Sequence, residues 1–290
     1  QTEFSLGAFG KIISRKYKLP FIHTYHTMWE DYVHYITPIK GRNIRLKRFV
    51  RKFSRGFVRK AECVITPSNK TAKYLKYKCN VKNKPIYVVP TGLDIAPFKS
   101  TNFTIEEKNE LKASLGIKPE EKIILFLGRV ANEKSVDVIM DNMPSIFEDY
   151  PNCKFLIVGD GPSKKDLEDQ AKKLNIADKV IFTGKVPWSD VPKYYNLGDV
   201  FVNASVTETQ GLTFIEAMAA EVPVVAKYAP NLSEFIKTGK NGILVKKNTD
   251  FKDAIIKVLD DQKLRETLIT GGNATAEEYS IEKFGDKLEM

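Results

Sequence analysis

The sequence predicts an α/β protein whose back half is a doubly wound parallel sheet of the Rossmann type, with an incomplete domain of the same kind before it. From Lys122 onward, short apolar runs alternate with amphipathic stretches of helical length. Buried β runs separated by such helices form parallel sheets, and their ligands bind at the carboxyl ends of the strands. Glycine-rich and charged stretches follow several of these runs, so we expect a site at that edge.

The back half is expected to form one domain over residues 121–276. Its predicted strands are residues 122–128, 154–161, 179–184, 199–205, 222–226 and 242–246, and its predicted helices lie near residues 134–148, 163–174, 188–197, 212–220 and 231–238. Two helical segments after residue 250 close this domain. Residues 277–290 start a further helix.

The front part repeats the pattern with fewer strands. Its predicted strands are residues 19–26, 61–68 and 84–92. Three strands are too few for a stable sheet of this kind, and the chain begins at Gln1 with a stretch typical of a helix already inside a domain. We therefore expect residues 1–96 to be the C-terminal portion of a longer Rossmann-like domain. Residues 97–120 are polar with one amphipathic helix, and we interpret them as the interdomain connection.

The composition is that of a soluble globular protein, with 42% hydrophobic and 28% charged residues. The three cysteines lie far apart and form no C-x-x-C, so neither a disulfide framework nor a zinc site is indicated, and a reducing cytosol fits. No run is long enough to cross a membrane, and the start does not resemble a signal peptide.

The positive charge is concentrated in the front part. The chain has a net charge of +10, and its first 100 residues hold 21 Lys and Arg against 5 Asp and Glu. Such an excess predicts an anionic partner, either a nucleic acid or a membrane surface.

Residues 40–60 carry ten Lys and Arg and no acid, with Phe49, Phe53 and Phe57 at helical spacing. As a helix, this segment suits the headgroup region of an anionic membrane, and Phe stripes can also pack into a core while the basic face stays solvated. A nucleic-acid-binding protein is a further alternative, although no fingerprint of such a module is found. The predicted membrane-contacting residues are Arg45, Arg48, Lys52, Arg55 and Arg59.

Two basic residues follow the first strand of the back half in "LFLGRVANEK". Arg129 comes after Gly128 at the strand's carboxyl end, and Lys134 stands five residues later at the start of a helix. A guanidinium fork and a mobile ammonium group suit a pyrophosphate above a helix N-terminus. The alternative is two solvated basic residues in a loop.

The next two strand ends are weaker signals. "VGDGP" is a glycine turn with Asp160 and Gly161, where backbone can approach a ligand, but it lacks the full G-x-G-x-x-G fingerprint. In "FTGKVP", the backbone of Lys185 and Val186 could read a base edge, and an ordinary loop explains the same residues.

The stretch "ETQGLTFIE" places seven residues between Glu208 and Glu216. A helix beginning near Leu212 would present the free N–H groups of Gly211, Leu212 and Thr213 to an anion. Glu216 could then accept hydrogen bonds from sugar hydroxyls. The alternative is that the acids only stabilise the helix dipole.

Taken in order, G-R-x4-K, "GDGP", "FTG" and E-x7-E followed by "EAMAAEVPVVA" resemble the retaining glycosyltransferase family 4, which has the two-Rossmann GT-B fold. The resemblance covers residues 121–240. It implies that Arg129 and Lys134 contact the donor diphosphate and that Glu216 holds the ribose. It further implies that Glu208 and the amides of Gly211, Leu212 and Thr213 face the donor hexose, and that the leaving diphosphate helps take the acceptor's proton.

The front stretch "HTYHTMWEDYVHY" is similar to bacterial diacylglycerol glucosyltransferases of family 4. His23 and His26 are three apart on a predicted strand, so they should point to opposite faces and not share a metal. The resemblance implies that His26 lies by the donor sugar, and a structural histidine is the alternative. Three residues are expected near the acceptor: Glu30, Asp31 and Tyr32.

These expectations combine into a retaining enzyme that transfers a hexose, most simply glucose, from a UDP-sugar to diacylglycerol as a peripheral protein on the cytoplasmic face of the membrane. The chain contains no D-x-D triplet, which agrees with catalysis without a metal or other cofactor. One alternative is a family 4 transferase for another lipid or a polysaccharide. Another is a truncated, inactive fragment that binds the nucleotide.

Overall fold

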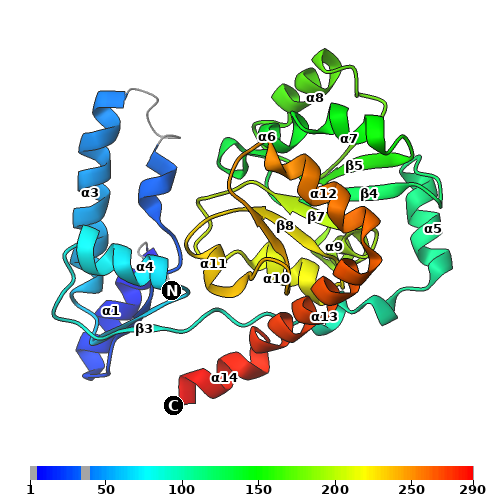
Figure 1. Cartoon of the computed structure of the whole chain (residues 1–290). Helices are drawn as coiled ribbons and strands as arrows, with labels where there is room; N and C mark the ends of the chain where they lie inside the picture. The colour runs from blue at the N-terminus through cyan, green and yellow to red at the C-terminus, as the bar shows by residue number, and fades with distance from the viewer. Residues whose placement is uncertain (1–4, 34–39, 290) are drawn as a thin grey trace. The chain divides into compact units, whose positions relative to one another are not determined.

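The computed structural model describes residues 5–33 and 40–289 and divides into two compact units. Unit 1 comprises residues 1–91 and 284–290, and unit 2 comprises residues 92–283. Each unit has its own parallel sheet (Figure 1). Each unit also has its own apolar core. The α/β class and the parallel sheets expected from the sequence are confirmed.

Unit 1 is built on a three-stranded parallel sheet with the order β1-β2-β3. Its buried residues include Tyr25, Val58, Val64 and Leu75, which form one cluster. The three predicted strands are present and shorter than expected. The elements are α1 (Ser5–Tyr17), β1 (Ile22–Thr24), η1 (Trp29–Tyr32), α3 (Lys40–Val58), β2 (Cys63–Thr66), α4 (Asn69–Lys73), the π-helical turn η2 (Tyr74–Lys78) and β3 (Ile86–Val88).

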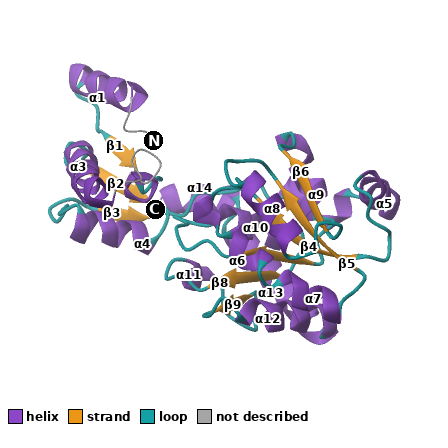
Figure 2. Ribbon diagram, turned by 90° about the horizontal axis from the view of Figure 1, so that it is seen from above, coloured by secondary structure: helices purple, strands orange, loops and turns teal. Residues whose placement is uncertain are grey.

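Unit 2 contains a six-stranded parallel sheet with the order β6-β5-β4-β7-β8-β9. Figure 2 shows β4, β5 and β6 toward one side of this sheet and β8 and β9 toward the other. The chain moves outward from β4 to β6, then returns to β7 beside β4 and continues to the other side. This reversal makes the gap between the ends of β4 and β7 the topological switch point, where open α/β sheets bind ligands. The strands are β4 (Lys122–Leu127), β5 (Cys153–Val158), β6 (Val180–Gly184), β7 (Val200–Asn203), β8 (Val224–Lys227) and β9 (Ile243–Val245).

Both faces of this sheet are buried, because β4 alternates its side chains between two apolar clusters. Ile123, Leu125 and Leu127 pack on one side, and Ile124 and Phe126 pack on the other. Parallel strands with helices over both faces read as continuous apolar runs, which is why the six strands could be located from sequence.

The helices of unit 2 follow the predicted pattern with two differences. The expected helix near residues 134–148 is broken between Met140 and Met143, because Pro144 cannot continue a preceding helix and instead occupies the first turn of a new one. The helix expected over residues 231–238 ends at Phe235. The helical segments are η3 (Ala96–Phe98), η4 (Ser100–Asn102), α5 (Ile105–Ser114), η5 (Asn132–Lys134), α6 (Val136–Met140), α7 (Met143–Asp149), α8 (Lys164–Lys173), η6 (Trp188–Asp190), α9 (Val191–Tyr195), α10 (Leu212–Ala219), α11 (Leu232–Phe235), α12 (Asp250–Asp260) and α13 (Gln262–Glu278). The last helix, α14 (Ile281–Glu289), begins in unit 2, and its residues from 284 onward are assigned to unit 1.

Residues 97–120, which we expected to connect two domains, lie in unit 2. Phe98 and Ile117 are buried in the cluster that also holds Leu125. Within this segment, α5 begins with a capping box in which Thr104 and Glu107 satisfy each other's backbone N–H groups. The segment therefore packs as part of the second core.

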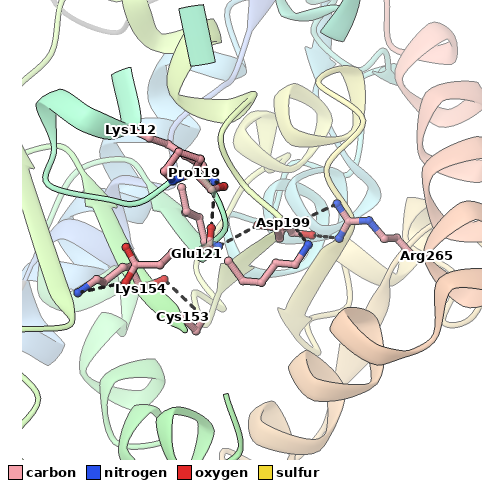
Figure 3. A network of polar contacts seen from close by, with 9 residues as sticks. Lys112, Pro119, Glu121, Cys153, Lys154, Asp199 and Arg265 are labelled. Atoms are coloured by element: carbon pink, nitrogen blue, oxygen red, sulfur yellow. Dashed lines mark hydrogen bonds and ion pairs between the residues drawn. The ribbon is translucent and has the colours of Figure 1, made fainter. Parts of the chain in front are cut away.

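A polar network ties together the amino ends of the central strands of unit 2 (Figure 3). Asp199, just before β7, accepts from the backbone N–H of Ile123 at 2.9 Å and pairs with Lys122 at 3.0 Å. Arg265 on α13 donates to the Asp199 carbonyl. Burial raises the pKa of the neighbouring Cys153 thiol to about 12, so this thiol stays protonated at neutral pH. These charges stabilise the edge opposite the one where a ligand is expected.

In the part of the chain that the structure describes, no helix has both the length and the apolar composition needed to span a membrane.

Candidate active site

The loops after β4 and β7 meet at the switch point through an ion pair. The Nζ atom of Lys134 lies 2.6 Å from Oε1 of Glu208, although the two residues are 74 positions apart in sequence. The side chains are only 20% and 14% exposed, respectively, so the pair is largely shielded from water. The hydroxyl of Thr207 also donates to the Glu133 carbonyl at 3.5 Å, which ties the two loops together a second time. The structure thus brings two of the predicted site residues into direct contact.

The loop after β4 turns sharply to place these side chains. It leaves the strand at Gly128, passes Arg129 with its side chain exposed, and forms the 3-10 turn η5 that ends in Lys134. Ser135 then adopts a left-handed conformation, with φ of 50°, and redirects the chain into α6. Arg129 therefore stands at the carboxyl edge of the sheet and is accessible to an anion.

The "GDGP" turn supports this loop through close packing. A Cβ on Gly161 would lie 2.2 Å from the Val130 carbonyl oxygen, and one on Gly159 would lie 2.0 Å from the Gly128 carbonyl oxygen. The Val130 N–H donates to the Asp160 carbonyl at 3.0 Å, and the Asp160 carboxylate accepts from its neighbour Gly161 at 2.7 Å. Only glycine permits this contact between two backbones. The expected ligand contacts of Asp160 and Gly161 stay a prediction, because the close packing of the two backbones is enough to explain why glycine stands at 159 and 161.

The "FTGKVP" loop reaches the same edge from β6, the outermost strand on its side of the sheet. Lys185 is exposed, and Val186 is half-buried against the apolar cluster beneath it. Their backbone groups remain candidates for contacting a base.

The helix after the β7 loop begins where the sequence predicts. Gly211 is its N-cap with φ of 89°, and Leu212 and Thr213 form the first turn. A Cβ at Gly211 would lie 2.8 Å from the Phe214 ring, so a larger residue would disturb the helix start. The first N–H groups of a helix have no partner inside it, and the positive end of the helix dipole adds to their attraction for an anion. This helix start lies at the end of the loop that carries Glu208.

Glu216 is buried and held by a residue that the sequence did not reveal. It is 4% exposed, and its Oε2 accepts a hydrogen bond of 2.7 Å from the Tyr195 hydroxyl on α9. Burial raises the pKa of Glu216, and the bond from Tyr195 acts in the opposite direction. Because α10 has no acid in its first turn and Glu216 is enclosed, stabilisation of the helix dipole does not explain this residue.

The histidines of unit 1 differ from expectation in one respect. Strand β1 ends at Thr24, so the alternation of a strand does not extend from His23 to His26. His23 is buried, with its ring 5.4 Å from that of Phe57. His26 follows the strand and is half-exposed. Within residues 5–33 and 40–289, the structure has no group of three or more potential metal ligands.

Glu30 joins two elements of unit 1. Its carboxylate forms a two-pronged ion pair with Arg51 on α3, including a bond of 2.7 Å from Arg51 Nε. Burial opposes the ionisation of Glu30, but the bond and charge of Arg51 outweigh it and lower its pKa. The structure therefore gives Glu30 a role in holding η1 to α3, which the sequence analysis did not anticipate. The side chains of Asp31 and Tyr32 lie outside what the structure describes, so their contact with the acceptor stays a prediction.

Helix α3 presents both apolar and basic side chains to solvent. Phe49 and Phe53 are 64% and 41% exposed, whereas Phe57 packs against His23. The alternative of a core-facing Phe stripe thus applies to Phe57 only. Four of the predicted membrane residues are exposed (Arg45, Arg48, Lys52 and Arg59), and Arg55 is half-buried. An open pocket of unit 1 is lined by Arg48, Arg51, Lys52, Arg55, Lys78 and Cys79.

Comparisons with known proteins show which family the chain belongs to. The family model described as "Glycosyl transferases group 1" matches residues 107–275, and the model described as "Glycosyltransferase Family 4" matches residues 1–96. The chain is 38% identical over 295 residues to an alpha-monoglucosyldiacylglycerol synthase of Streptococcus pneumoniae, with 99% of the chain aligned. It is 31% identical over 291 residues to a protein of the same name from Acholeplasma laidlawii.

Solved structures share the fold at lower identity. A crystal structure of Anabaena HepE in complex with UDP-glucose matches 98% of this chain and 74% of that one, with a TM-score of 0.78 and 20% identity. Sucrose-phosphate synthase from Thermosynechococcus elongatus matches 98% of this chain and 69% of that one, with a TM-score of 0.79 and 23% identity. These likenesses confirm the predicted GT-B fold class.

The chain spans 64% of the length of the pneumococcal relative and 72% of that of the Acholeplasma relative. The two family models together extend from residue 1 to residue 275, and the first alone matches more than half of the chain. The protein therefore belongs to the family 4 glycosyltransferases.

Proposed function

We propose that this chain belongs to a retaining glycosyltransferase that moves a hexose, glucose in the first instance, from a UDP-sugar to diacylglycerol. The observation that carries the proposal is the contact between Lys134 and Glu208 at the switch point of unit 2, beside the start of α10. Cationic, anionic and helix-terminal groups are thereby available within one edge of a nucleotide-type sheet. The names of the two relatives supply the lipid acceptor.

The donor diphosphate is assigned to the positive groups of this edge. Arg129 offers a guanidinium fork, Lys134 offers a mobile ammonium group, and the N-terminus of α10 offers free N–H groups. Charge develops on the diphosphate as the sugar leaves, and fixed positive groups stabilise it at that moment. This arrangement supports a reaction without a metal ion or other cofactor, as we proposed from sequence.

The rest of the donor is assigned from one end of the nucleotide sugar to the other. The backbone of Lys185 and Val186 contacts the uracil edge, and Glu216 accepts from the ribose hydroxyls. Glu208 and the amides of Gly211, Leu212 and Thr213 face the hexose. The role near the donor sugar that the family resemblance gives to His26 stays a prediction. Gly128, Asp160 and Gly161 complete the donor-binding loops.

The ion pair between Lys134 and Glu208 gives this donor site an internal counter-ion. Glu208 neutralises Lys134 at 2.6 Å. A bound diphosphate competes with Glu208 for the ammonium group, since both are anionic. Glu208 is then released toward the hexose, so the same carboxylate that masks the cation becomes available to orient the sugar.

The acceptor side of the proposal rests on helix α3. Its exposed phenylalanines and cations can lie in the headgroup region of an anionic membrane, with about 1 kcal/mol gained per basic residue near the surface. We propose that α3 binds the chain peripherally to the cytoplasmic face of the membrane, where diacylglycerol is found within the lipid layer.

A transfer assay with purified chain and liposomes tests the proposed function. Radiolabelled UDP-glucose, UDP-galactose and GDP-mannose are each offered with diacylglycerol, glucosyl-diacylglycerol or a soluble polysaccharide, and the anomer of the product is read by NMR. The expected product is α-glucosyl-diacylglycerol, formed from UDP-glucose and abolished by Glu208→Ala.

Three other results would redirect the assignment. A different lipid product or a polysaccharide product would keep the chemistry and change the acceptor. UDP binding without transfer to any acceptor would make the chain a nucleotide-binding fragment. The absence of UDP binding would overturn the donor site itself.

A further inference from the structure

The Tyr195 hydroxyl makes a contact that the motif analysis leaves unexplained. Tyr195 is the last residue of α9 and is fully buried, with its ring 5.7 Å from both Phe98 and Phe201. A phenylalanine would fill this aromatic position equally well, so packing alone gives no reason for a hydroxyl group. A buried hydroxyl without a hydrogen bond is costly, and this one has its partner in Glu216.

The geometry divides the Glu216 carboxylate into two parts with different roles. Oε2 accepts from the Tyr195 hydroxyl at 2.7 Å. Oε1 makes no hydrogen bond to the residues that the structure describes, and this oxygen is not fully enclosed by protein atoms. One oxygen is therefore anchored inside unit 2, while the other keeps access to a ligand.

The same hydroxyl also lies 3.3 Å from the carbonyl oxygen of Thr213, one turn before Glu216 on α10. A tyrosine hydroxyl has a single hydrogen, so the shorter contact to Glu216 is the main bond and the longer one is secondary. Both contacts connect α9 to the first two turns of α10. They fix how far the Glu216 side chain extends from its helix.

We propose that Tyr195 is a positioning residue for donor binding, which anchors one oxygen of Glu216 so that the other is held toward the ribose hydroxyls of a uridine nucleotide. The proposal rests on the ribose contact of Glu216 in the proposed function. It adds a residue that touches no part of the donor and acts only through Glu216.

The electrostatics of the pair support this role. Burial raises the pKa of Glu216, and the hydrogen bond from Tyr195 keeps that pKa lower than burial alone would. Two charged groups act on the Tyr195 hydroxyl, Glu216 and Glu208, and Glu208 is paired with Lys134. Removing the hydroxyl should therefore let Glu216 take up a proton at a higher pH, and a protonated carboxyl accepts less well from a ribose hydroxyl.

The test is Tyr195→Phe, with Tyr194→Phe as the matched control on the same short helix. Tyr194 is half-buried against the same apolar cluster, and the charge that acts on its hydroxyl is that of Asp190. The dissociation constants of UDP, 2′-deoxy-UDP and 3′-deoxy-UDP are measured by calorimetry between pH 5.5 and pH 8.5, and the melting temperature of each variant is recorded.

The expected result has three parts. Tyr195→Phe weakens UDP binding roughly tenfold, the value of one hydrogen bond to a charged group. The pH at which affinity falls on acidification moves upward relative to the wild type. The weakening shrinks with at least one of the deoxy nucleotides, because the affected ribose contact is missing there, and Tyr194→Phe behaves as the wild type.

Two outcomes separate this inference from the proposed function. If Glu216→Ala weakens UDP binding and Tyr195→Phe does not, the positioning role is overturned and the ribose contact stands. If Glu216→Ala leaves UDP binding unchanged, the ribose contact is wrong and the positioning role falls with it.

Glu216→Asp provides a second route if Tyr195→Phe lowers the melting temperature. This change keeps the charge but withdraws the carboxylate by one methylene from both Tyr195 and the ribose. If Tyr195 acts only through Glu216, adding Tyr195→Phe to Glu216→Asp should cost little further UDP affinity, and an additive loss in the double variant would contradict the proposal.

Discussion

Lys134 and Glu208 form an ion pair of 2.6 Å that joins the loops after β4 and β7 of unit 2. These loops flank the switch point of the sheet, where the order of strands reverses. We propose that a bound donor separates this pair, so that Lys134 turns to the diphosphate and Glu208 to the sugar.

We expect opposite effects on UDP affinity when the two partners are changed. Lys134→Ala removes a cation from the diphosphate site and should weaken UDP binding roughly tenfold. Glu208→Gln removes the competing anion, so UDP binding should be unchanged or tighter while transfer to the acceptor is lost. Calorimetry of UDP and a transfer assay on both variants check this contrast, and an equal loss of UDP affinity in both would contradict it.

Glu216 should make the protein less stable at neutral pH than it would be with a neutral side chain. Its pKa is raised by burial, so its contribution to stability is largest below the usual pKa of glutamate and is lost as the pH rises through the raised value. Glu216→Gln should therefore raise the melting temperature at pH 7, with a smaller gain near pH 4, and should weaken UDP binding.

Thermal unfolding at the two pH values measures this effect, where a gain of about 1 kcal/mol corresponds to roughly 2–4 °C. Glu168→Gln on the exposed side of α8 is the matched control and should show no such pH-dependent gain, because its carboxylate is 41% exposed. A lower melting temperature for Glu216→Gln at pH 7 would show that the ionised carboxylate stabilises the fold.

Gly161→Ala should disturb the loop that carries Arg129. The new methyl group would lie 2.2 Å from the Val130 carbonyl oxygen, so the two backbones must separate. We expect a cost of about 1–3 kcal/mol in the free energy of unfolding, together with weaker UDP binding. Gly285→Ala adds a methyl group inside α14 where nothing lies within 4 Å, so it should leave UDP binding unchanged and should not lower the free energy of unfolding, because alanine favours a helix over glycine. Unchanged UDP affinity in Gly161→Ala would show that this turn does not contribute to donor binding.

Helix α3 should bind anionic membranes through its basic face. Replacing Arg48, Lys52 and Arg59 by Glu should lower the affinity for phosphatidylglycerol liposomes by roughly 100-fold or more, because each cation contributes about 1 kcal/mol near the surface. The affinity is measured by sedimentation with the liposomes. The binding of the wild type should also fall as salt is added.

The control for this change is charge reversal at exposed lysines of α8, Lys172→Glu and Lys173→Glu, which should leave liposome binding intact. If the wild type does not bind these liposomes, or binds equally in high salt, the membrane role of α3 is wrong.

Much of the fold could be predicted from sequence because its strands are buried on both faces. Residues 123–127, for example, are apolar without a break, which is the pattern of a short strand between two layers of helices. Boundaries were less accurate where a single residue decides them. Pro144 breaks the helix expected over residues 134–148, and β1 ends before His26.

The site was predicted as a set of positions but not as a set of contacts. Lys134 and Glu208 were both identified, and their ion pair depends on the adjacency of β4 and β7, which an apolar pattern does not specify. Tyr195 escaped notice because "VPKYYNLGD" resembles any amphipathic turn. The role of its hydroxyl becomes visible only in the fold, where it donates to Glu216.

Arg51 was missed for a related reason. It is one of ten Lys and Arg in residues 40–60, and nothing local distinguishes it from its neighbours. The fold selects it by bringing Glu30 against α3.

We propose above all that the carboxyl edge of unit 2 binds a uridine nucleotide through Arg129 and its neighbours. The decisive measurement is a calorimetric titration of UDP into the wild type and Arg129→Ala, with the exposed Lys173→Ala of α8 as the control. Wild type and control should bind UDP alike, and Arg129→Ala should lose about tenfold or more in affinity with an unchanged melting temperature. Equal UDP affinity in all three proteins, or no binding by the wild type, would contradict it.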